Sequence, residues 1–211
     1  MHGKFITFEG IDGSGKSTQL RMLAESLRMK GIDVLATFEP GDTPLGRRLR
    51  EAFLETEEVV APIAELLLFA ADRAQHVEYL IRPALKAGRI VISDRYADAT
   101  AAYQGAGRGF DENTVAQVIE LATSGLRPDL TLFFDITLET AAKRMADRQG
   151  TDTVENRMDR ETADFYSRVR NAYLDIARRE PNRFKIVEAN GSPDDTHAKV
   201  FEIVSVFLNR K

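Results

Sequence analysis

Residues 8–18 decide the fold of this chain, and they read Phe8-Glu9-Gly10-Ile11-Asp12-Gly13-Ser14-Gly15-Lys16-Ser17-Thr18. The stretch joins a short apolar run, Lys4 to Phe8, to a segment from Lys16 to Arg28 in which apolar residues recur at helical spacing. It matches the pattern G-x-x-x-x-G-K-[ST] between a strand and a helix, a loop whose backbone N–H groups converge on phosphate oxygens. The start of the helix adds its partial positive charge. The sequence therefore predicts a nucleoside triphosphate site at the end of the first strand.

Two side chains of this phosphate loop have specific expected roles. Lys16 is expected to bridge the β- and γ-phosphates, and the Ser17 hydroxyl to ligate Mg²⁺. Asp94 follows the apolar run Ile90 to Ile92 and is expected to face the same metal ion. The alternatives are a glycine-rich turn with a surface lysine, and an aspartate that caps a helix. The residues expected to bind ATP in this loop are Gly10, Ile11, Asp12, Gly13, Ser14, Gly15, Lys16, Ser17 and Thr18.

Apolar runs and helical periodicities alternate along the whole chain. Strands are expected over residues 4–8, 34–38, 90–92, 130–134 and 184–187. Helices are expected over residues 16–28, 45–53, 62–80, 115–122, 138–148, 165–176 and 200–207, a glycine-rich loop over 105–109 and a polar loop over 149–160. The alternation predicts an α/β fold of the P-loop NTPase type, with a parallel five-stranded sheet and helices on both faces. We expect one domain over residues 1–211 with a small lid at about 144–160.

Composition excludes several classes of protein. The 211 residues carry 29 Lys and Arg against 33 Asp and Glu, a net charge of −4, which argues against a general binder of nucleic acid or of a membrane surface. The chain has no Cys, so a disulfide framework and a thiolate metal site are excluded. It has no apolar run of about 18 residues that could span a membrane. The N-terminus enters a strand directly, without a signal peptide, and we expect a cytoplasmic protein.

Four further segments carry motifs, and they read Glu39-Pro40-Gly41, Phe69-Ala70-Ala71-Asp72-Arg73, Asp94-Arg95-Tyr96 and Ala102-Tyr103-Gln104-Gly105-Ala106-Gly107-Arg108-Gly109. Together with the phosphate loop they resemble the thymidylate kinase family, from residue 4 to about residue 190. The resemblance implies transfer of a phosphoryl group from ATP to dTMP, giving dTDP for dTTP synthesis. It also implies Mg²⁺, direct in-line transfer without a covalent intermediate, and a homodimer.

The resemblance implies how dTMP is bound. Phe69 offers a flat face to the pyrimidine, although core packing is the alternative at its helical spacing. Arg73 lies on the same helix face and would donate to a thymine carbonyl, while Gln104 can both donate and accept at the base edge. Tyr103 would abut the sugar, where its bulk disfavours a 2′-hydroxyl. The implied dTMP-binding residues are Glu39, Pro40, Phe69, Arg73, Arg95, Thr100, Tyr103 and Gln104.

Catalysis would rest on positioning and on positive charge. Arg95 would hold the acceptor phosphate with its fork of donors, and Asp12 would accept from the sugar 3′-hydroxyl. The phosphate loop carries no Arg, which matches the class of the family with arginines in the lid. Arg144, also expected to bind ATP, is the second candidate there, and Arg157 is expected to anchor the lid. The implied catalytic residues are Asp12, Lys16, Arg95 and Arg148, the last with a solvated helix end as its alternative.

Phe38 and Asp42 depart from the family pattern Arg-Glu-Pro-Gly-Gly-Thr, in which an Arg and a Gly stand at these positions. Both differences make the surroundings of the acceptor phosphate less positive. Arg47, Arg48 or Arg50 could compensate. Two other functions stay open at this point. One is a kinase for another nucleoside monophosphate or a nucleoside, and the other is a binding module that uses ATP as a switch.

Overall fold

Five parallel strands form the centre of this computed structural model, which describes residues 3–148 and 157–209. The strands are β1 (Lys4–Glu9), β2 (Val34–Phe38), β3 (Ile90–Asp94), β4 (Leu130–Asp135) and β5 (Phe184–Glu188). Their order is β2-β3-β1-β4-β5, and every neighbouring pair is parallel. Asp94 is in register with both Phe8 and Phe38, so the carboxyl ends of β1, β2 and β3 meet at one edge. The predicted five-stranded parallel sheet is confirmed.

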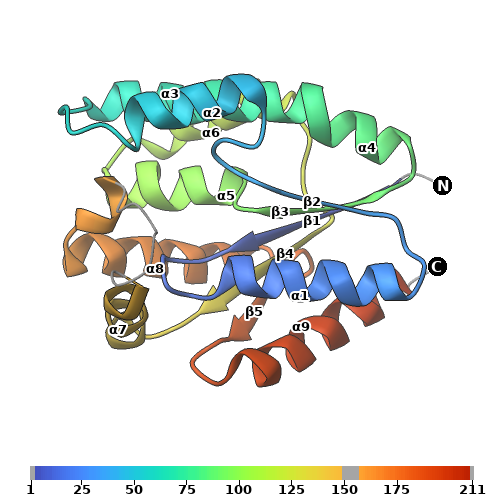
Figure 1. Ribbon diagram of the computed structural model, residues 1–211. Coiled ribbons are helices and arrows are strands. Elements are labelled where there is room, and N and C mark those ends of the chain that lie inside the picture. The colour runs from blue at the N-terminus through green and yellow to red at the C-terminus, as the bar shows by residue number, and fades with distance from the viewer. Residues whose placement is uncertain (1–2, 149–156, 210–211) are drawn as a thin grey trace.

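Helices cover both faces of the sheet, as predicted (Figure 1). One face carries α1 (Lys16–Met29) and α9 (Pro193–Leu208), which pack against each other. The other face carries α3 (Pro62–His76), α4 (Arg82–Lys86), α6 (Glu112–Thr123) and α8 (Ala163–Arg179), with α5 (Ala97–Thr100) near the sheet edge. α2 (Pro44–Phe53) packs on α3, and α7 (Leu138–Arg148) lies beside the phosphate loop.

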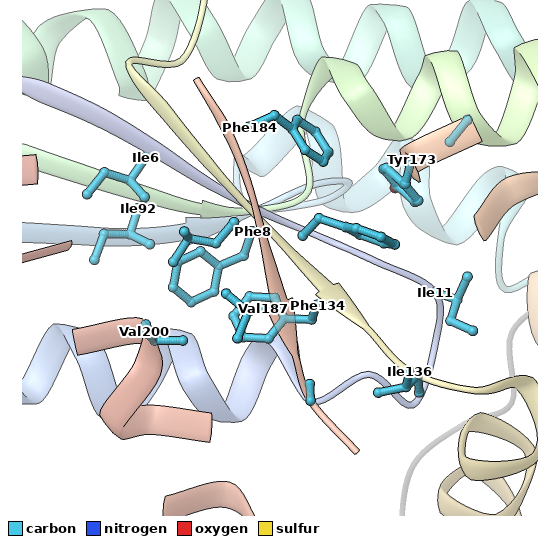
Figure 2. Packing of buried hydrophobic residues seen from close by; sticks show 14 of the residues in the cluster. Ile6, Phe8, Ile11, Ile92, Phe134, Ile136, Tyr173, Phe184, Val187 and Val200 are labelled. Atoms are coloured by element: carbon cyan, nitrogen blue, oxygen red, sulfur yellow. The ribbon is translucent and has the colours of Figure 1, made fainter. Parts of the chain in front are cut away.

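The hydrophobic core follows from the alternation of side chains along the strands. In Figure 2, Phe8 and Phe134 lie on the side of the sheet where Val200 of α9 is drawn, and the Phe8 and Phe134 rings are 4.9 Å apart. Phe133, the neighbour of Phe134 along β4, points to the opposite face and stacks on Tyr173 of α8 at 4.9 Å. Burial of both faces explains why the central strands read as continuous apolar runs.

The helix predicted over residues 62–80 extends further and changes its winding. Residues Val77–Ile81 form a π-helical turn, in which the N–H of Arg82 donates to the carbonyl of Val77. Pro83 has no N–H and its ring would collide with the carbonyl four residues earlier in a regular α-helix. The wider turn accommodates this proline, and α4 continues the same helical rod to Lys86.

The glycine-rich loop predicted over residues 105–109 is wrong for most of its length. Residues Ala101–Gly107 form a second π-helical segment that directly continues α5. A side chain on Gly107 would come within 2.6 Å of the Phe165 ring of α8, so the glycine permits close packing of two helices. The glycines therefore serve helix contact here. The segment buries Tyr103 and Gln104 instead of exposing them on a loop.

The polar loop predicted over residues 149–160 needs a correction at its end, because Arg157–Arg160 form a 3₁₀ helix. Residues 149–156 lie outside the described residues, so the lid expected at about 144–160 stays a prediction there. The other expected strands and helices occur, with ends shifted by a few residues. Over residues 3–148 and 157–209, no helix is both long and apolar enough to cross a membrane.

Candidate functional site

The phosphate loop has the backbone of an anion site. Gly10, Gly13 and Gly15 adopt φ angles of 147°, 80° and 90°, which other residues rarely adopt. A side chain on Gly10 would also lie 2.8 Å from the carbonyl oxygen of Phe134. Gly15 caps α1 without a side-chain hydrogen bond, and the first turn of α1 holds no acidic residue. The N–H groups and the dipole at this helix end are therefore directed at an incoming anion.

Several other residues expected to bind ATP have buried or half-buried side chains. Ile11 is buried in the core at the end of β1 (Figure 2), so its backbone is the part that faces a nucleotide. Ser14 is buried and lies 3.4 Å from the Lys16 Nζ. Thr18 is half-buried in the first turn of α1. Binding by this loop would rest mainly on backbone N–H groups and on two side chains, Lys16 and Ser17.

Lys16 is buried beneath the loop, and its ammonium group is held by the loop's own carbonyls. The Nζ donates to the carbonyl oxygens of Gly10 and Ile11, each at 3.0 Å. Burial, with the positive charge of Arg95, lowers the pKa of Lys16 to about 8 from the ordinary value of 10.5. The carbonyls that accept from it carry no net charge. A bound phosphate would add negative charge beside Lys16 and raise its pKa again.

Ser17 and Asp94, the two residues expected to hold Mg²⁺, are hydrogen-bonded to each other. The Ser17 hydroxyl donates to Oδ2 of Asp94 at 2.5 Å, although the residues are far apart in sequence. The other oxygen, Asp94 Oδ1, is buried and has no hydrogen-bond partner among the described residues. One carboxylate with a spare oxygen and one hydroxyl suit Mg²⁺, which takes few protein ligands and completes its shell with waters and phosphate oxygens. No cluster of three or more His, Asp or Glu suited to another metal occurs among the described residues.

Arg95 is held in a strained backbone conformation at the end of β3, with a φ of 69°. Hydrogen bonds fix the strained residue on both sides: its N–H donates to Phe8 O at 2.9 Å, and Ser93 Oγ donates to its carbonyl at 2.7 Å. The guanidinium donates to Asp12 Oδ1 at 2.7 Å and lies over the Tyr103 ring at 4.8 Å. The sheet edge therefore points this arginine at the phosphate loop.

A cavity of about 500 Å³ opens at this edge of the sheet and brings the predicted site residues together. It is lined from the phosphate-loop side by Asp12, Lys16, Ser17 and Asp94. It is lined from the other side by every residue expected to bind dTMP, namely Glu39, Pro40, Phe69, Arg73, Arg95, Thr100, Tyr103 and Gln104. A volume of this order fits a nucleotide-sized ligand. Residues from the phosphate loop, α1, β2, α3, β3 and the π-helical segment thus share one surface.

Phe69 lies between the core and the cavity, and its stacking on a pyrimidine stays a prediction. Its ring packs edge-on against Phe53 of α2 at 4.8 Å, and it is partly buried against the core. It also lines the cavity. The packing against Phe53 fixes the plane of the ring, which prepares it for stacking.

Arg73 is fully buried and its donors are set by three protein acceptors. Its Nε donates to Glu39 Oε2 at 2.8 Å, Nη1 to Thr100 Oγ1 at 2.7 Å and Nη2 to the carbonyl of Tyr96 at 2.9 Å. The second oxygen of Glu39 contacts the His76 Nδ1 at 2.8 Å. Glu39 and Thr100 therefore position Arg73 in the cavity wall. A direct contact of Glu39 or Thr100 with dTMP stays a prediction.

Gln104 is almost fully buried, and its amide nitrogen donates to Glu65 Oε1 at 2.8 Å. Glu65 lies in the first turn of α3 with none of its surface exposed. Its carboxylate also accepts hydrogen bonds from Arg108 and Arg157. Glu65 was not singled out in the sequence, because one acid at a helix start normally reads as an exposed residue of the first turn.

Phe38 and Asp42 both line the cavity, as their place in the departing motif suggested. The Phe38 side chain is 41% exposed, and Asp42 Oδ2 accepts from Thr37 Oγ1 at 2.5 Å. Asp42 does not adopt a positive φ, so the turn accepts this residue without backbone strain. Of the three arginines that could compensate for the lost charge, Arg50 lines the cavity, and its Nη1 donates to the Pro40 carbonyl at 3.1 Å.

The structure describes the side-chain contacts of two of the three candidate lid arginines. Arg144 bridges the phosphate loop to the chain after β5, because it donates to the carbonyls of Gly13 at 3.4 Å and Ala189 at 3.0 Å. Arg148 ends α7, and its side chain lies outside what is described. Arg157 donates to the carboxylate of Glu65 and to the carbonyl of Phe53. Arg157 is thus anchored to α3, in line with an anchoring role.

Glu9 is a further residue at the site that sequence reasoning left without a role. It is fully buried at the end of β1, where Oε1 accepts from the Tyr96 N–H and Oε2 from the Tyr173 hydroxyl, both at 2.8 Å. Burial and the nearby Asp98 carboxylate raise its pKa to about 8. Because Tyr96 directly follows Arg95, Glu9 adds a hydrogen bond beside the strained residue. An acid closing an apolar strand was the signal available in the sequence.

Comparisons with known proteins identify relatives over the whole fold. A family model described as "Thymidylate kinase" matches residues 8–200. The thymidylate kinase of Desulfovibrio desulfuricans is 44% identical over 98% of this chain and 97% of its own length. That of Nitratidesulfovibrio vulgaris is 46% identical, with 97% of each chain covered. The crystal structure of thymidylate kinase from Ehrlichia chaffeensis superposes with a TM-score of 0.79 and 34% identity, covering 97% of this chain and 100% of the other.

Proposed function

The chain belongs to the thymidylate kinase family and phosphorylates dTMP with ATP, and from this premise we propose which of its residues carry out the transfer. The product, dTDP, is the precursor of dTTP. The proposal assigns the phosphate loop to ATP and the opposite wall of the cavity to dTMP. The observation that carries it is that the phosphate-loop lysine Lys16 and the strained Arg95 line the same cavity.

The acceptor side would hold dTMP by base, sugar and phosphate. Phe69 stacks on the thymine ring, Arg73 donates to a thymine carbonyl and Gln104 reads the base edge. Tyr103 is buried against the Arg95 guanidinium and limits the space beside the sugar. Asp12 accepts from the 3′-hydroxyl, and Arg95 binds the acceptor phosphate. Arg50 supplies a further positive charge at the wall where Phe38 and Asp42 have reduced it.

The donor side would hold ATP by its phosphates. Backbone N–H groups of residues 10–18 surround the β- and γ-phosphates, with Lys16 beside them. Ser17 and Asp94 would hold Mg²⁺, which when bound neutralises charge on the triphosphate. Arg144 lies between Gly13 and the chain after β5, where it would support the loop, and Arg148 would approach the transferred group as the catalytic arginine. Residues at about 144–160 act as a lid of a single domain in this proposal.

The reaction proposed is a direct in-line displacement. An oxygen of the dTMP phosphate attacks the γ-phosphorus of ATP, and the bond from that phosphorus to the β,γ-bridging oxygen breaks. No general base is required, because the attacking oxygen is already an anion. Lys16 and Arg95 face this charge from the donor and acceptor sides, so the protein contributes orientation and electrostatic stabilisation.

A panel of acceptors tests the assignment of the base and sugar sites. Purified protein with ATP and Mg²⁺ is expected to turn over dTMP with a kcat/KM at least about 10-fold above dCMP, dGMP and dAMP, because buried hydrogen-bonding groups reject bases that leave them unpaired. ADP release would be measured for each monophosphate, including dUMP. Equal turnover of all acceptors would contradict the assignment and favour a general monophosphate kinase. No turnover of any would favour an ATP-binding switch.

The lowered pKa of Lys16 predicts proton uptake when ATP binds. Near pH 8.5 the free protein holds Lys16 largely neutral, since its pKa of about 8 lies below that pH. The triphosphate, already ionised there, should raise the pKa and draw a proton from solvent. Titration calorimetry in buffers of different ionisation enthalpy would measure uptake of up to about three quarters of a proton. Near pH 6 the Lys16 contribution should vanish, because the lysine is already charged.

Lys16→Arg is the matched control for this experiment. Arginine keeps the positive charge but stays protonated at every accessible pH. The uptake near pH 8.5 should therefore disappear in this variant while nucleotide binding remains measurable. Equal uptake by the wild type and Lys16→Arg would assign the proton to another group.

We propose that the protein assembles as a homodimer. The exposed apolar side chains Ile63 and Leu67 lie on the outer face of α3, 50% and 54% exposed, and would be covered in a homodimer. Light scattering at micromolar concentration would give the mass of a dimer or of a monomer.

The cytoplasm is the proposed location, as a chain without Cys suits a reducing compartment.

A further inference from the structure

Gln104 has an amide whose orientation is decided by a neighbour, not by the nucleotide. An amide side chain carries a donor and an acceptor at nearly equal positions, so it can present either to a ligand. One end of the Gln104 amide lies 2.8 Å from Oε1 of the Glu65 carboxylate. An ionised carboxylate only accepts hydrogen bonds. The NH₂ group must therefore face Glu65, and the carbonyl oxygen is the end left for the cavity.

Glu65 is built to remain ionised, which this orientation requires. Arg108 donates to both of its oxygens, at 3.1 and 3.0 Å, and Arg157 donates to Oε2. Burial alone would favour the neutral acid, but hydrogen bonds from Arg108, Arg157 and Gln104 outweigh it and lower the pKa of Glu65. Its place in the first turn of α3 adds the favourable end of the helix dipole. A protonated Glu65 would release the amide to turn.

The arginines are themselves fixed, so the network is rigid. Arg108 lies over the Phe165 ring at 4.8 Å, and its Nη2 also donates to Glu161 Oε1 at 2.6 Å. Arg157 donates through Nε to the carbonyl of Phe53. Packing and charge therefore hold Glu65 against Gln104 from two sides.

We propose that Glu65 is a specificity-determining positioning residue, which turns the carbonyl oxygen of Gln104 toward the base and so selects a base with an N–H at ring position 3. Thymine and uracil carry this N–H, whereas cytosine has an unprotonated acceptor nitrogen there. Two acceptors facing each other in a buried site lose a hydrogen bond and repel. The proposal rests on the acceptor site assigned above and concerns a residue that does not itself touch the nucleotide.

The test compares three monophosphates in the wild type and Glu65→Gln. A glutamine at position 65 can present either its oxygen or its NH₂, so Gln104 is no longer forced into one orientation. We expect kcat/KM for dTMP and dUMP to fall together by about 10-fold or more, while that for dCMP does not fall. The dTMP-to-dCMP ratio should thus drop about 10-fold, and the dTMP-to-dUMP ratio should stay within about twofold. A purely structural defect would lower all three equally.

Glu112→Gln is the matched control, because it makes the same change in an exposed ion pair with Arg179 that lies outside this network. Both substrate ratios should be unchanged in this variant. Gln104→Leu should lower the dTMP-to-dCMP ratio as Glu65→Gln does, and the double variant should lower it no further. An unchanged ratio in Glu65→Gln, or fully additive effects in the double variant, would overturn the proposal. A wild type without preference for dTMP over dCMP would instead defeat the proposed function.

A measurement on the wild type keeps the proposal testable if Glu65→Gln does not fold. The side-chain amide of Gln104 can be followed by NMR and assigned by its absence in Gln104→Leu. We expect its NH₂ signals to move little when dTMP binds, because Glu65 already holds them, while the carbonyl carbon shifts. Large movement of the NH₂ signals with a stationary carbonyl carbon would mean that the amide faces the base with its nitrogen.

Discussion

Lys16→Met is expected to lower kcat for phosphorylation of dTMP by about 10²- to 10³-fold, with the thermal unfolding midpoint shifted by only a few degrees. Removing one preorganised donor from a site of developing negative charge costs this much in rate. Methionine fills a volume similar to lysine but cannot donate to the phosphates. Steady-state kinetics with saturating ATP and dTMP, with calorimetry for stability, would measure both quantities.

The small effect on stability follows from the direction of the pKa shift of Lys16. Its folded-state value of about 8 lies below the ordinary 10.5, so burying the charged form costs free energy at neutral pH. Methionine removes this cost and also removes the hydrogen bonds to Gly10 and Ile11. Lys86→Met, at an exposed position in the last turn of α4, is the matched control and should leave kcat unchanged. A kcat within about threefold of wild type in Lys16→Met would contradict the donor-site assignment.

Arg95→Lys is expected to lower kcat/KM for dTMP by about 10²- to 10³-fold while changing KM for ATP only a few-fold. Lysine keeps the charge but loses the planar fork that binds two phosphate oxygens at once. It also loses the contact over the Tyr103 ring and the directed hydrogen bond to Asp12. Varying each substrate separately in the kinetic assay distinguishes the acceptor site from the donor site.

A second arginine-to-lysine substitution is the matched control for Arg95→Lys. Arg89→Lys changes an exposed ion pair with Asp33 at the amino end of β3, and it should leave both KM values unchanged. An Arg95→Lys enzyme that weakened ATP and dTMP equally would show that Arg95 serves the fold of the sheet edge more than the acceptor. Full activity in Arg95→Lys would remove Arg95 from the acceptor site.

The fold was predictable from local patterns, for a physical reason. Strands buried on both faces must be apolar throughout, and helices that cover them must be apolar on one side, so both leave a period in the sequence. Prediction failed where helices changed their winding. The helix predicted over residues 62–80 continues beyond a π-helical turn at Val77–Ile81, and most of the glycine-rich loop predicted over residues 105–109 is π-helical. Whether a glycine ends a helix depends on what packs against it, as Phe165 packs at Gly107.

The sequence predicted which residues line the candidate site, but it did not predict the hydrogen bonds that hold them. Every residue expected to bind dTMP lines the cavity, because each belongs to a motif at the end of a strand or on a helix face next to it. One residue that orients them, Glu65, was missed. Glu65 lies 39 positions from Gln104 and 92 from Arg157. No spacing pattern links residues at such distances.

The sequence by itself determined the parallel sheet, the phosphate loop at the end of β1 and the family motifs. Each of these features depends on residues that are close together in the sequence. Only the tertiary structure decided which polar groups are buried together. It placed Glu65 between two arginines and Gln104, gave Arg95 its positive φ, and left one oxygen of Asp94 without a hydrogen-bond partner among the described residues. Hydrogen-bond direction and desolvation depend on distances of a few ångströms between segments remote in sequence, and those distances exist only in the folded chain.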